Sequence, residues 1–112
     1  MANGLYQSYQ VLQGDTLSGI ALWWYGYGTE PYWRRIWLAS RHVIGSDPDQ
    51  IQPGMWIRLP YWGFWCHIVE GDTLWQIAQW VYGDGNAYWI IAQANPTIDP
   101  DNIYPSMWVY VP

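Results

Sequence analysis

The chain has 112 residues, a formal net charge of −5 from nine acidic residues and four arginines, and one cysteine. This length allows one ordinary domain or two very small ones, and the acidic balance excludes nucleic acid, which needs a basic surface, as an expected partner. The apolar runs are far shorter than the roughly 18 residues of a membrane span, so no membrane insertion is expected. A single cysteine excludes an internal disulfide and a cysteine-rich metal site.

Aromatic residues are unusually abundant, with eleven Trp and ten Tyr against one Phe. Both Trp and Tyr combine an apolar ring with a polar atom and are enriched at interfaces. Two very small cores cannot hide so many rings, so we expect some of them on the surface.

A repeat organises the sequence. Gly-Asp-Thr-Leu occurs at residues 14–17 and again, 57 positions later, at 71–74. The offset falls to 55 between Ile36 and Ile91, and to 52 between Met55 and Met107. The first copy therefore has two extra residues near Glu30 and three within 41–46. Such self-similarity indicates a duplicated structural unit whose loops absorb the length changes.

The first copy is preceded by residues 1–8, which we expect to form a tail. Alternating residues over 9–13 predict a short strand. Thr16 is placed to cap a helix, and Gly26 is placed to end it. The apolar stripe of this helix has the spacing i, i+3, i+4, i+7 and consists of Leu17, Ile20, Ala21 and Trp24.

A second helix is predicted over 32–40. We expect its arginines, Arg34 and Arg35, to point outward, and its inward side chains to be Trp33, Ile36 and Trp37. A loop is expected over 41–52, and the final strand over 55–59.

The second copy predicts the same order of strand, helix, helix and strand. The strands are expected over 66–70 and 107–111 and the second helix over 87–94. Thr73 and Gln76 form a capping box for the first helix, which Gly83 ends; its stripe is Leu74, Ile77, Ala78 and Val81. Four of the five connector residues 61–65 are aromatic, unlike a flexible Gly/Ser linker. We therefore expect two lobes held in a fixed relation.

These motifs resemble the LysM domain: Gly-Asp-Thr-Leu after a strand, Ile-Ala in the first helix, Ala-Asn-Pro at 94–96, and a final strand ending in Pro. The resemblance covers 9–60 and 66–112. It implies an α+β fold of two tandem βααβ LysM units, each with two helices packed on a two-stranded antiparallel sheet. Tyr-Gly-Asp-Gly at 82–85 resembles a bacterial and phage-tail branch of the family.

The resemblance also implies non-catalytic binding of an N-acetylglucosamine-containing glycan, either peptidoglycan or chitin. The sugars would lie in a shallow groove between the strand–helix loop and the loop before the last strand. In the second copy the implied walls are Gly71, Asp72, Thr73 and Leu74, and Asn95, Pro96, Thr97 and Ile98. The first copy keeps Gly14, Asp15, Thr16 and Leu17 but has Ser40-Arg41 in place of Asn-Pro, so the second copy is the better expected site.

Several polar residues have simpler structural interpretations. Asp15 and Asp72 suit the start of a helix, although both stay among the binding candidates. Asp-Pro-Asp at 47–49 and 99–101 indicates turns, because too few oxygens are present for calcium. We expect His42 and His67 to be solvated or packed and Cys66 to be buried. Neither a cofactor nor a metal site is predicted, and the familiar catalytic motifs are missing, so an enzyme is not expected.

Five tryptophans are candidates for an interface: Trp23, Trp80, Trp56, Trp108 and Trp89. Three roles are open for them from the sequence: an inter-repeat core, a surface for a protein partner or a homo-oligomer, or a platform for sugar rings. A protein surface would fit a structural adaptor, as in proteins that resemble phage-tail and contractile-injection baseplates. Localisation also stays open. No secretion signal is visible, so a cell-wall location requires another export route, and membership of a phage-like particle is the alternative.

Overall fold

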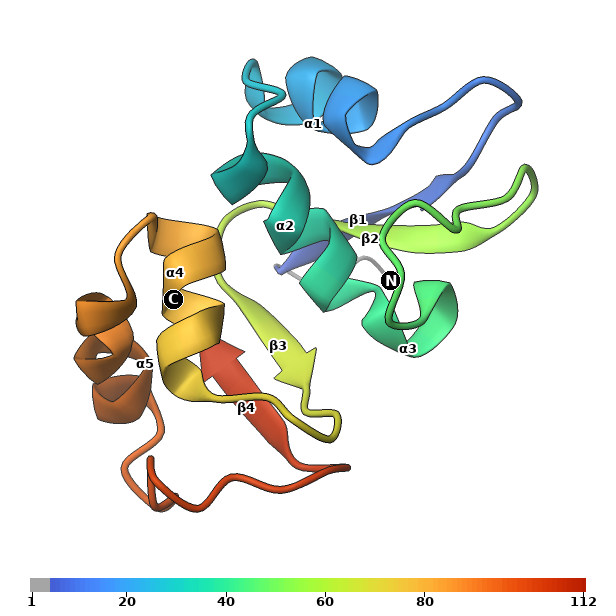
Figure 1. The fold of residues 1–112 in the computed structure, drawn as a ribbon. Helices are drawn as coiled ribbons and strands as arrows, with labels where there is room; N and C mark the ends of the chain where they lie inside the picture. Colours follow the sequence, from blue (N-terminus) through green and yellow to red (C-terminus); the bar gives the residue numbers. More distant parts are fainter. Residues whose placement is uncertain (1–4) are drawn as a thin grey trace.

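Residues 5–112 form two separate two-stranded antiparallel sheets. In the computed structural model, which describes residues 5–112, β1 (Tyr6–Gln10) pairs with β2 (Trp56–Pro60), and β3 (Phe64–His67) pairs with β4 (Trp108–Val111). Each sheet joins the beginning and the end of one half of the chain (Figure 1). We call residues 5–60 the first lobe and residues 64–112 the second lobe.

The first helix of each lobe is capped by the threonine that the sequence predicts. In α1 (Leu17–Tyr25) the Gly19 amide donates to Thr16 Oγ1 over 3.1 Å, and in α4 (Leu74–Tyr82) the Gln76 amide donates to Thr73 Oγ1 over 3.0 Å. Both helices end at a glycine with positive φ, Gly26 at 86° and Gly83 at 75°, a conformation that side chains with a Cβ rarely adopt.

The strands and the long loop differ from the prediction. Tyr6 to Ser8, expected in a tail, belong to β1 because they pair with Arg58–Pro60; residues 1–4 of that expected tail lie outside the described residues. Two connector residues, Phe64 and Trp65, belong to β3. The loop expected over 41–52 opens with a short helix, α3 (Arg41–Ile44). A 3₁₀ turn, η1 (Gly85–Ala87), precedes α5 (Tyr88–Ala94).

The second helix of the first lobe, α2 (Glu30–Ala39), joins the lobes. It packs on α1 and β2 in its own lobe and on α4 and β3 in the other, and lies between them in Figure 1. The prediction that Arg35 points outward is wrong. Arg35 is fully buried, its Nη1 donates to the Trp62 carbonyl over 3.1 Å, and its guanidinium lies 3.8 Å from the Trp62 ring centroid. An aromatic face attracts a desolvated guanidinium, which lets this charge lie between the lobes.

The candidate interface tryptophans have different surroundings. Trp80 lies between the lobes against Trp37, whereas the other four are exposed: Trp23 (67%), Trp56 (58%), Trp89 (56%) and Trp108 (46%). The first lobe does not cover α5, whose packing partners are α4, η1 and β4. The two lobes meet instead through α2 and α3 of the first lobe and α4 and β3 of the second.

The histidines and the cysteine take the ordinary roles expected of them. The rings of His67 and His42 lie 4.8 and 6.1 Å from that of Trp108, measured between centroids. Cys66 is completely buried. Within residues 5–112, no helix has the length and apolar character needed to cross a membrane.

Candidate functional site

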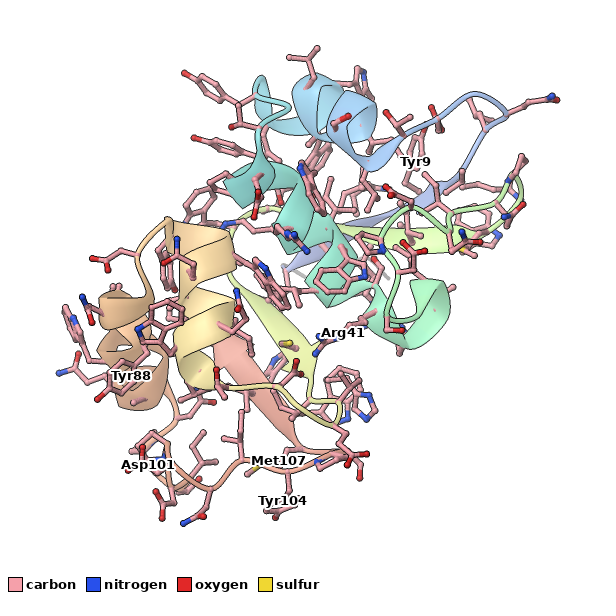
Figure 2. The ribbon with its side chains drawn as sticks, viewed as in Figure 1. Tyr9, Arg41, Tyr88, Asp101, Tyr104 and Met107 are labelled. Atoms are coloured by element: carbon pink, nitrogen blue, oxygen red, sulfur yellow. The ribbon has the colours of Figure 1, made fainter. Side chains whose placement is uncertain are left out.

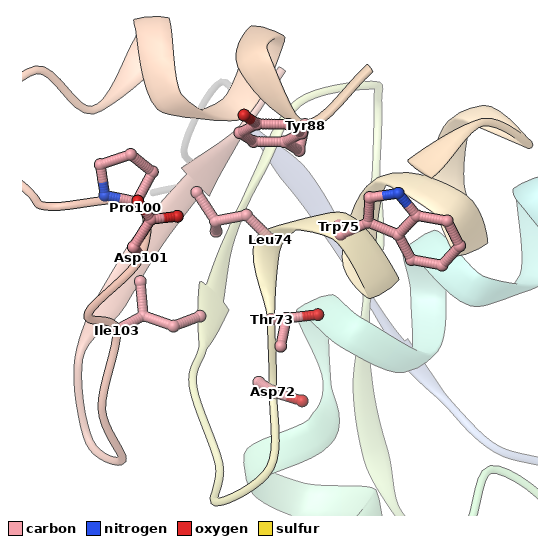
Figure 3. Close-up of a pocket in the computed structure, with 8 residues that line it drawn as sticks. All are labelled: Asp72, Thr73, Leu74, Trp75, Tyr88, Pro100, Asp101 and Ile103. Carbon is pink, nitrogen blue, oxygen red and sulfur yellow. The ribbon is translucent and has the colours of Figure 1, made fainter. Parts of the chain in front are cut away.

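An open hollow of about 360 Å³ lies on the second lobe beside the start of α4 (Figure 3). We call it the groove. One side is the turn into α4, and the other combines α5 with the loop before β4, which carry Tyr88 and Asp101 in Figure 2. Its lining residues are Asp72, Thr73, Leu74 and Trp75, with Tyr88, Pro100, Asp101 and Ile103 opposite. Apolar side chains and oxygen atoms therefore face the same space.

The groove contains only one of the two walls implied by the resemblance. Asp72, Thr73 and Leu74 line it, and Gly71, with φ of 90°, makes the turn beside them. The segment Asn95–Ile98 is not among the lining residues; Tyr88 and Pro100–Ile103 form that side instead.

The side chain of Asn95 is occupied within the fold. Its Nδ2 donates to the carbonyls of Ile91 and Tyr110, both over 2.7 Å, and its Oδ1 accepts from the Tyr110 amide over 2.9 Å. Asn95 thus ties α5 to β4 behind the groove, and any contact of residues 95–98 with a glycan stays a prediction.

Sequence reasoning missed the contributions of Trp75, Tyr88, Pro100, Asp101 and Ile103 to the groove. A signal was present in the repeated Asp-Pro-Asp, interpreted only as a turn. That interpretation is confirmed: Asp99 accepts from the Asp101 amide over 3.0 Å, and Asp47 accepts likewise from Asp49. A hydrogen bond from Asn102, then that backbone bond, lowers the pKa of Asp99. The turn sets Pro100 and Asp101 against the groove.

The first lobe has a smaller hollow of about 190 Å³ at the corresponding place. Its lining residues are Thr16, Leu17, Ser18, Trp33, Pro48 and Asp49. Each of them matches a groove residue at the sequence offsets of 57, 55 or 52. The two hollows are therefore lined by residues at matching positions of the sequence repeat, with Ser18 where the second lobe has Trp75.

The sequence of the second lobe matches the LysM domain family over residues 66–112. These residues form a LysM domain. A single such domain is found, so the expectation of two tandem LysM units is confirmed for this part of the chain only. The α+β architecture with two-stranded antiparallel sheets fits the family.

Two curated proteins from Mycobacterium tuberculosis are similar to this chain: Esterase MT1326 of strain CDC 1551 and Esterase Rv1288 of strain H37Rv. Each is 35% identical over 97 residues, which are 87% of this chain and 20% of the relative. The chain thus spans about one fifth of the length of these relatives. The spore cortex-lytic enzyme SleL of Bacillus megaterium QM B1551 is a solved structure with 24% identity and a TM-score of 0.39, covering 98% of this chain and 23% of that one.

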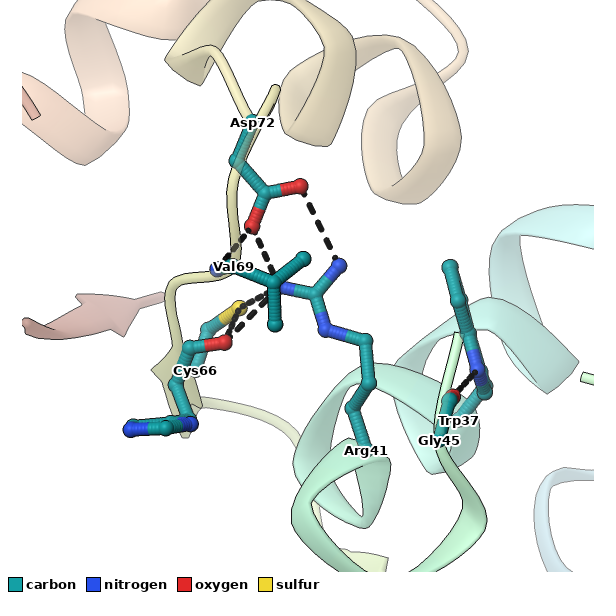
Figure 4. Close-up of polar contacts among 7 residues, drawn as sticks. Trp37, Arg41, Gly45, Cys66, Val69 and Asp72 are labelled. Atoms are coloured by element: carbon teal, nitrogen blue, oxygen red, sulfur yellow. Dashed lines mark hydrogen bonds and ion pairs between the residues drawn. The ribbon is translucent and has the colours of Figure 1, made fainter. Parts of the chain in front are cut away.

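One of the two carboxylates that line the LysM groove is held by other groups of the protein. The carboxylate of Asp72 is already engaged by the Val69 amide over 2.9 Å and by Arg41 (Figure 4). The eight lining residues include no histidine, cysteine or arginine, and residues 5–112 contain no group of three side chains able to hold a metal ion. The LysM family that residues 66–112 match is a family of non-catalytic domains.

Proposed function

We propose that the LysM domain of residues 66–112 binds an N-acetylglucosamine-containing glycan, with peptidoglycan as the first choice, without cleaving it. The observation that carries the proposal is the groove between the turn into α4 and the loop before β4, at the start of a domain whose family generally binds such glycans. Chitin contains the same sugar and is the alternative polymer.

The lining suits this sugar chemically. Tyr88 and Ile103 present apolar surface that can cover the acetamido methyl group and the C–H face of a pyranose ring (Figure 3). Asp101 contributes carboxylate oxygens, which accept hydrogen bonds from sugar hydroxyl and amide groups. Two acidic residues and no basic ones among the lining residues favour an uncharged sugar over an anionic one.

We also propose that the first lobe is a diverged copy of the same unit, spanning residues 9–60 of the sequence repeat. The matched hollow supports this, and so does the alignment with the esterases, whose 97 residues extend beyond the 47 of the LysM match. Ser40, at the position of Asn95, makes an equivalent link. It exchanges hydrogen bonds with the backbone of Arg58, which matches Tyr110. Because Ser18 replaces Trp75, we expect weaker glycan binding in the first lobe.

Calorimetric titration with N-acetylglucosamine oligomers of increasing length and with peptidoglycan fragments tests the proposal. We expect Tyr88→Ala to weaken binding about tenfold, the equivalent of ~1.4 kcal/mol of lost apolar contact. Trp89→Ala is the matched control, because this neighbouring ring on α5 is exposed outside the groove. Wild-type protein that binds none of these ligands at millimolar concentration would overturn the proposal.

A protein-assembly role is the second candidate, supported by the exposed rings of Trp23, Trp56, Trp89 and Trp108. Exposed apolar side chains mark a partner surface when they gather in one contiguous patch. Sedimentation and co-purification discriminate the two functions. A monodisperse monomer without a partner, which nevertheless binds the glycan, leaves glycan binding as the function.

In a longer protein, we propose that this chain acts as a glycan-targeting module beside other parts. The relatives named as esterases have about four fifths of their length outside the region that this chain matches. An ester-hydrolysis assay on this chain alone is expected to give no turnover above background.

A further inference from the structure

The turn that builds one wall of the LysM groove closes on the side chain of Asp72. The Val69 amide donates to Asp72 Oδ2 over 2.9 Å, and the Asp72 amide donates back to the Val69 carbonyl over 3.1 Å. Gly71 between them has φ of 90°. The next two residues, Thr73 and Leu74, line the groove. The position of the Asp72 carboxylate therefore sets the shape of this wall.

The corresponding turn of the first lobe is held from within that lobe. The Leu12 amide donates to Asp15 Oδ2 over 2.8 Å, and the hydroxyl of Tyr9 donates to the same oxygen over 2.7 Å. The residue of the second lobe that matches Tyr9, at the offset of 57, is Cys66. Cysteine has no phenolic hydroxyl to extend to the carboxylate, so this support is missing from the second lobe.

An arginine from the other lobe takes the place of that hydroxyl (Figure 4). Arg41 Nη1 donates to Asp72 Oδ1 over 3.2 Å, Nη2 donates to Asp72 Oδ2, and Nη2 also donates to the His67 carbonyl over 2.8 Å. The two charged side chains are 2% and 6% exposed. A paired, buried contact of this kind is geometrically demanding and strongly directional.

The sequence repeat explains where this arginine comes from. Arg41 matches Pro96 at the offset of 55, so the first lobe has Ser40-Arg41 where the LysM domain has Asn-Pro. Ser40 keeps the link between helix and strand. The next residue is arginine in the first lobe where the LysM domain has proline, and this arginine side chain enters the other lobe.

We propose that Arg41 is a positioning residue for the groove of the LysM domain: the first lobe holds the Asp72 turn in its binding shape. The expected effect of Arg41 on glycan affinity rests on the proposed function. The expected effect of Arg41 on the Asp72 turn does not. Arg41 is not among the residues that line the groove, so it acts through Asp72. Residues 66–112 on their own would then bind the glycan more weakly than the same residues do in the whole chain.

The test compares Arg41→Met with Arg34→Met in the full chain. Arg34 lies at the same lobe contact, over the rings of Trp33 and Trp80, but its ion pair is with Glu30 and not with Asp72, so it serves as the matched control. For Arg41→Met we expect affinity for N-acetylglucosamine oligomers to fall about three- to tenfold, the range of coupling through packed neighbours. Amide hydrogen exchange at Val69 should accelerate, while exchange at Leu12 in the matched turn should not.

Arg41→Lys is the conservative variant, and it should restore part of both effects because it keeps the charge but not the forked donor geometry. If Arg41→Met does not fold, the same two measurements on Arg41→Lys decide whether Arg41 positions the Asp72 turn. Unchanged exchange at Val69 and unchanged affinity in the folded Arg41 variant would overturn the inference. Wild-type protein that fails to bind the oligomers would overturn the proposed function instead, and exchange at Val69 would still decide the role of Arg41.

Discussion

The indole rings of Trp37 and Trp80 meet edge to face across the two lobes, with centroids 5.1 Å apart and ring planes at 73°. Trp37 is buried and donates from Nε1 to the Gly45 carbonyl over 2.9 Å. The residue of the first lobe that matches Trp80 is Trp23, which is exposed. The same position of the repeat therefore packs between the lobes as Trp80 and faces solvent as Trp23.

This difference predicts unequal effects of two matched substitutions. Trp80→Ala should lower the free energy of unfolding by about 2–3 kcal/mol, because it removes a ring packed between the lobes. Trp23→Ala should cost less than about 1 kcal/mol, since most of its ring is already in water. Urea unfolding of the two variants checks the prediction. A loss for Trp80→Ala as small as that for Trp23→Ala would mean that the lobe contact contributes little to stability.

Cys66 is expected to be chemically inert in the folded protein. Burial raises the pKa of its thiol from the usual 9.0 to about 12, and the thiolate is the reactive form. Ellman's reagent at pH 8 should therefore label Cys66 only after denaturant is added. Because the folded-state pKa is raised, this burial contributes stability that is fully present below pH 9 and is lost as the pH rises toward 12. Rapid labelling without denaturant would contradict the buried position of the side chain.

The hydrogen bond between Tyr9 and Asp15 should be visible in a titration. The bond to Asp15, followed by desolvation and the charge of Asp15, raises the pKa of Tyr9 to about 12. Asp15→Asn should lower that pKa toward the usual value of about 10 for tyrosine. The difference in ultraviolet absorbance between each protein and its Tyr9→Phe variant isolates this one phenol. Because the pKa is higher in the folded state, the stability that this hydrogen bond contributes should be fully present below pH 10 and be lost as the pH rises through 12.

Asn95→Ala is expected to act on stability and not directly on binding. The substitution removes two hydrogen bonds from the end of α5 to Tyr110 of β4 and one to Ile91 within α5, and it should cost about 2–4 kcal/mol, since buried backbone groups lose their partner. Gln93→Ala is the control, because that residue of α5 is exposed. Thermal unfolding measures the loss. Wild-type stability combined with lost glycan affinity would instead support the direct contact implied by the resemblance to the family.

Much of each lobe could be predicted from the sequence because the relevant interactions are local. The caps at Thr16 and Thr73 bond to amides three residues away, and Gly26 and Gly83 end their helices through their own backbone conformation. The apolar stripes place Ile20 and Ile77 in the core without reference to the rest of the chain. The repeat itself predicts that the chain divides into two halves, and the two separate sheets agree with that division.

Only the tertiary structure decided how the two units meet and which residues surround the groove. An arginine on a helix is normally expected in water, yet Arg35 is buried against Trp62, and Arg41 reaches a carboxylate 31 residues away. The wall formed by Tyr88 and Ile103 likewise depends on how α5 and the last loop pack on α4. Local periodicity carries no information about such pairings, because the free energy that decides them comes from side chains brought together only when the chain has folded.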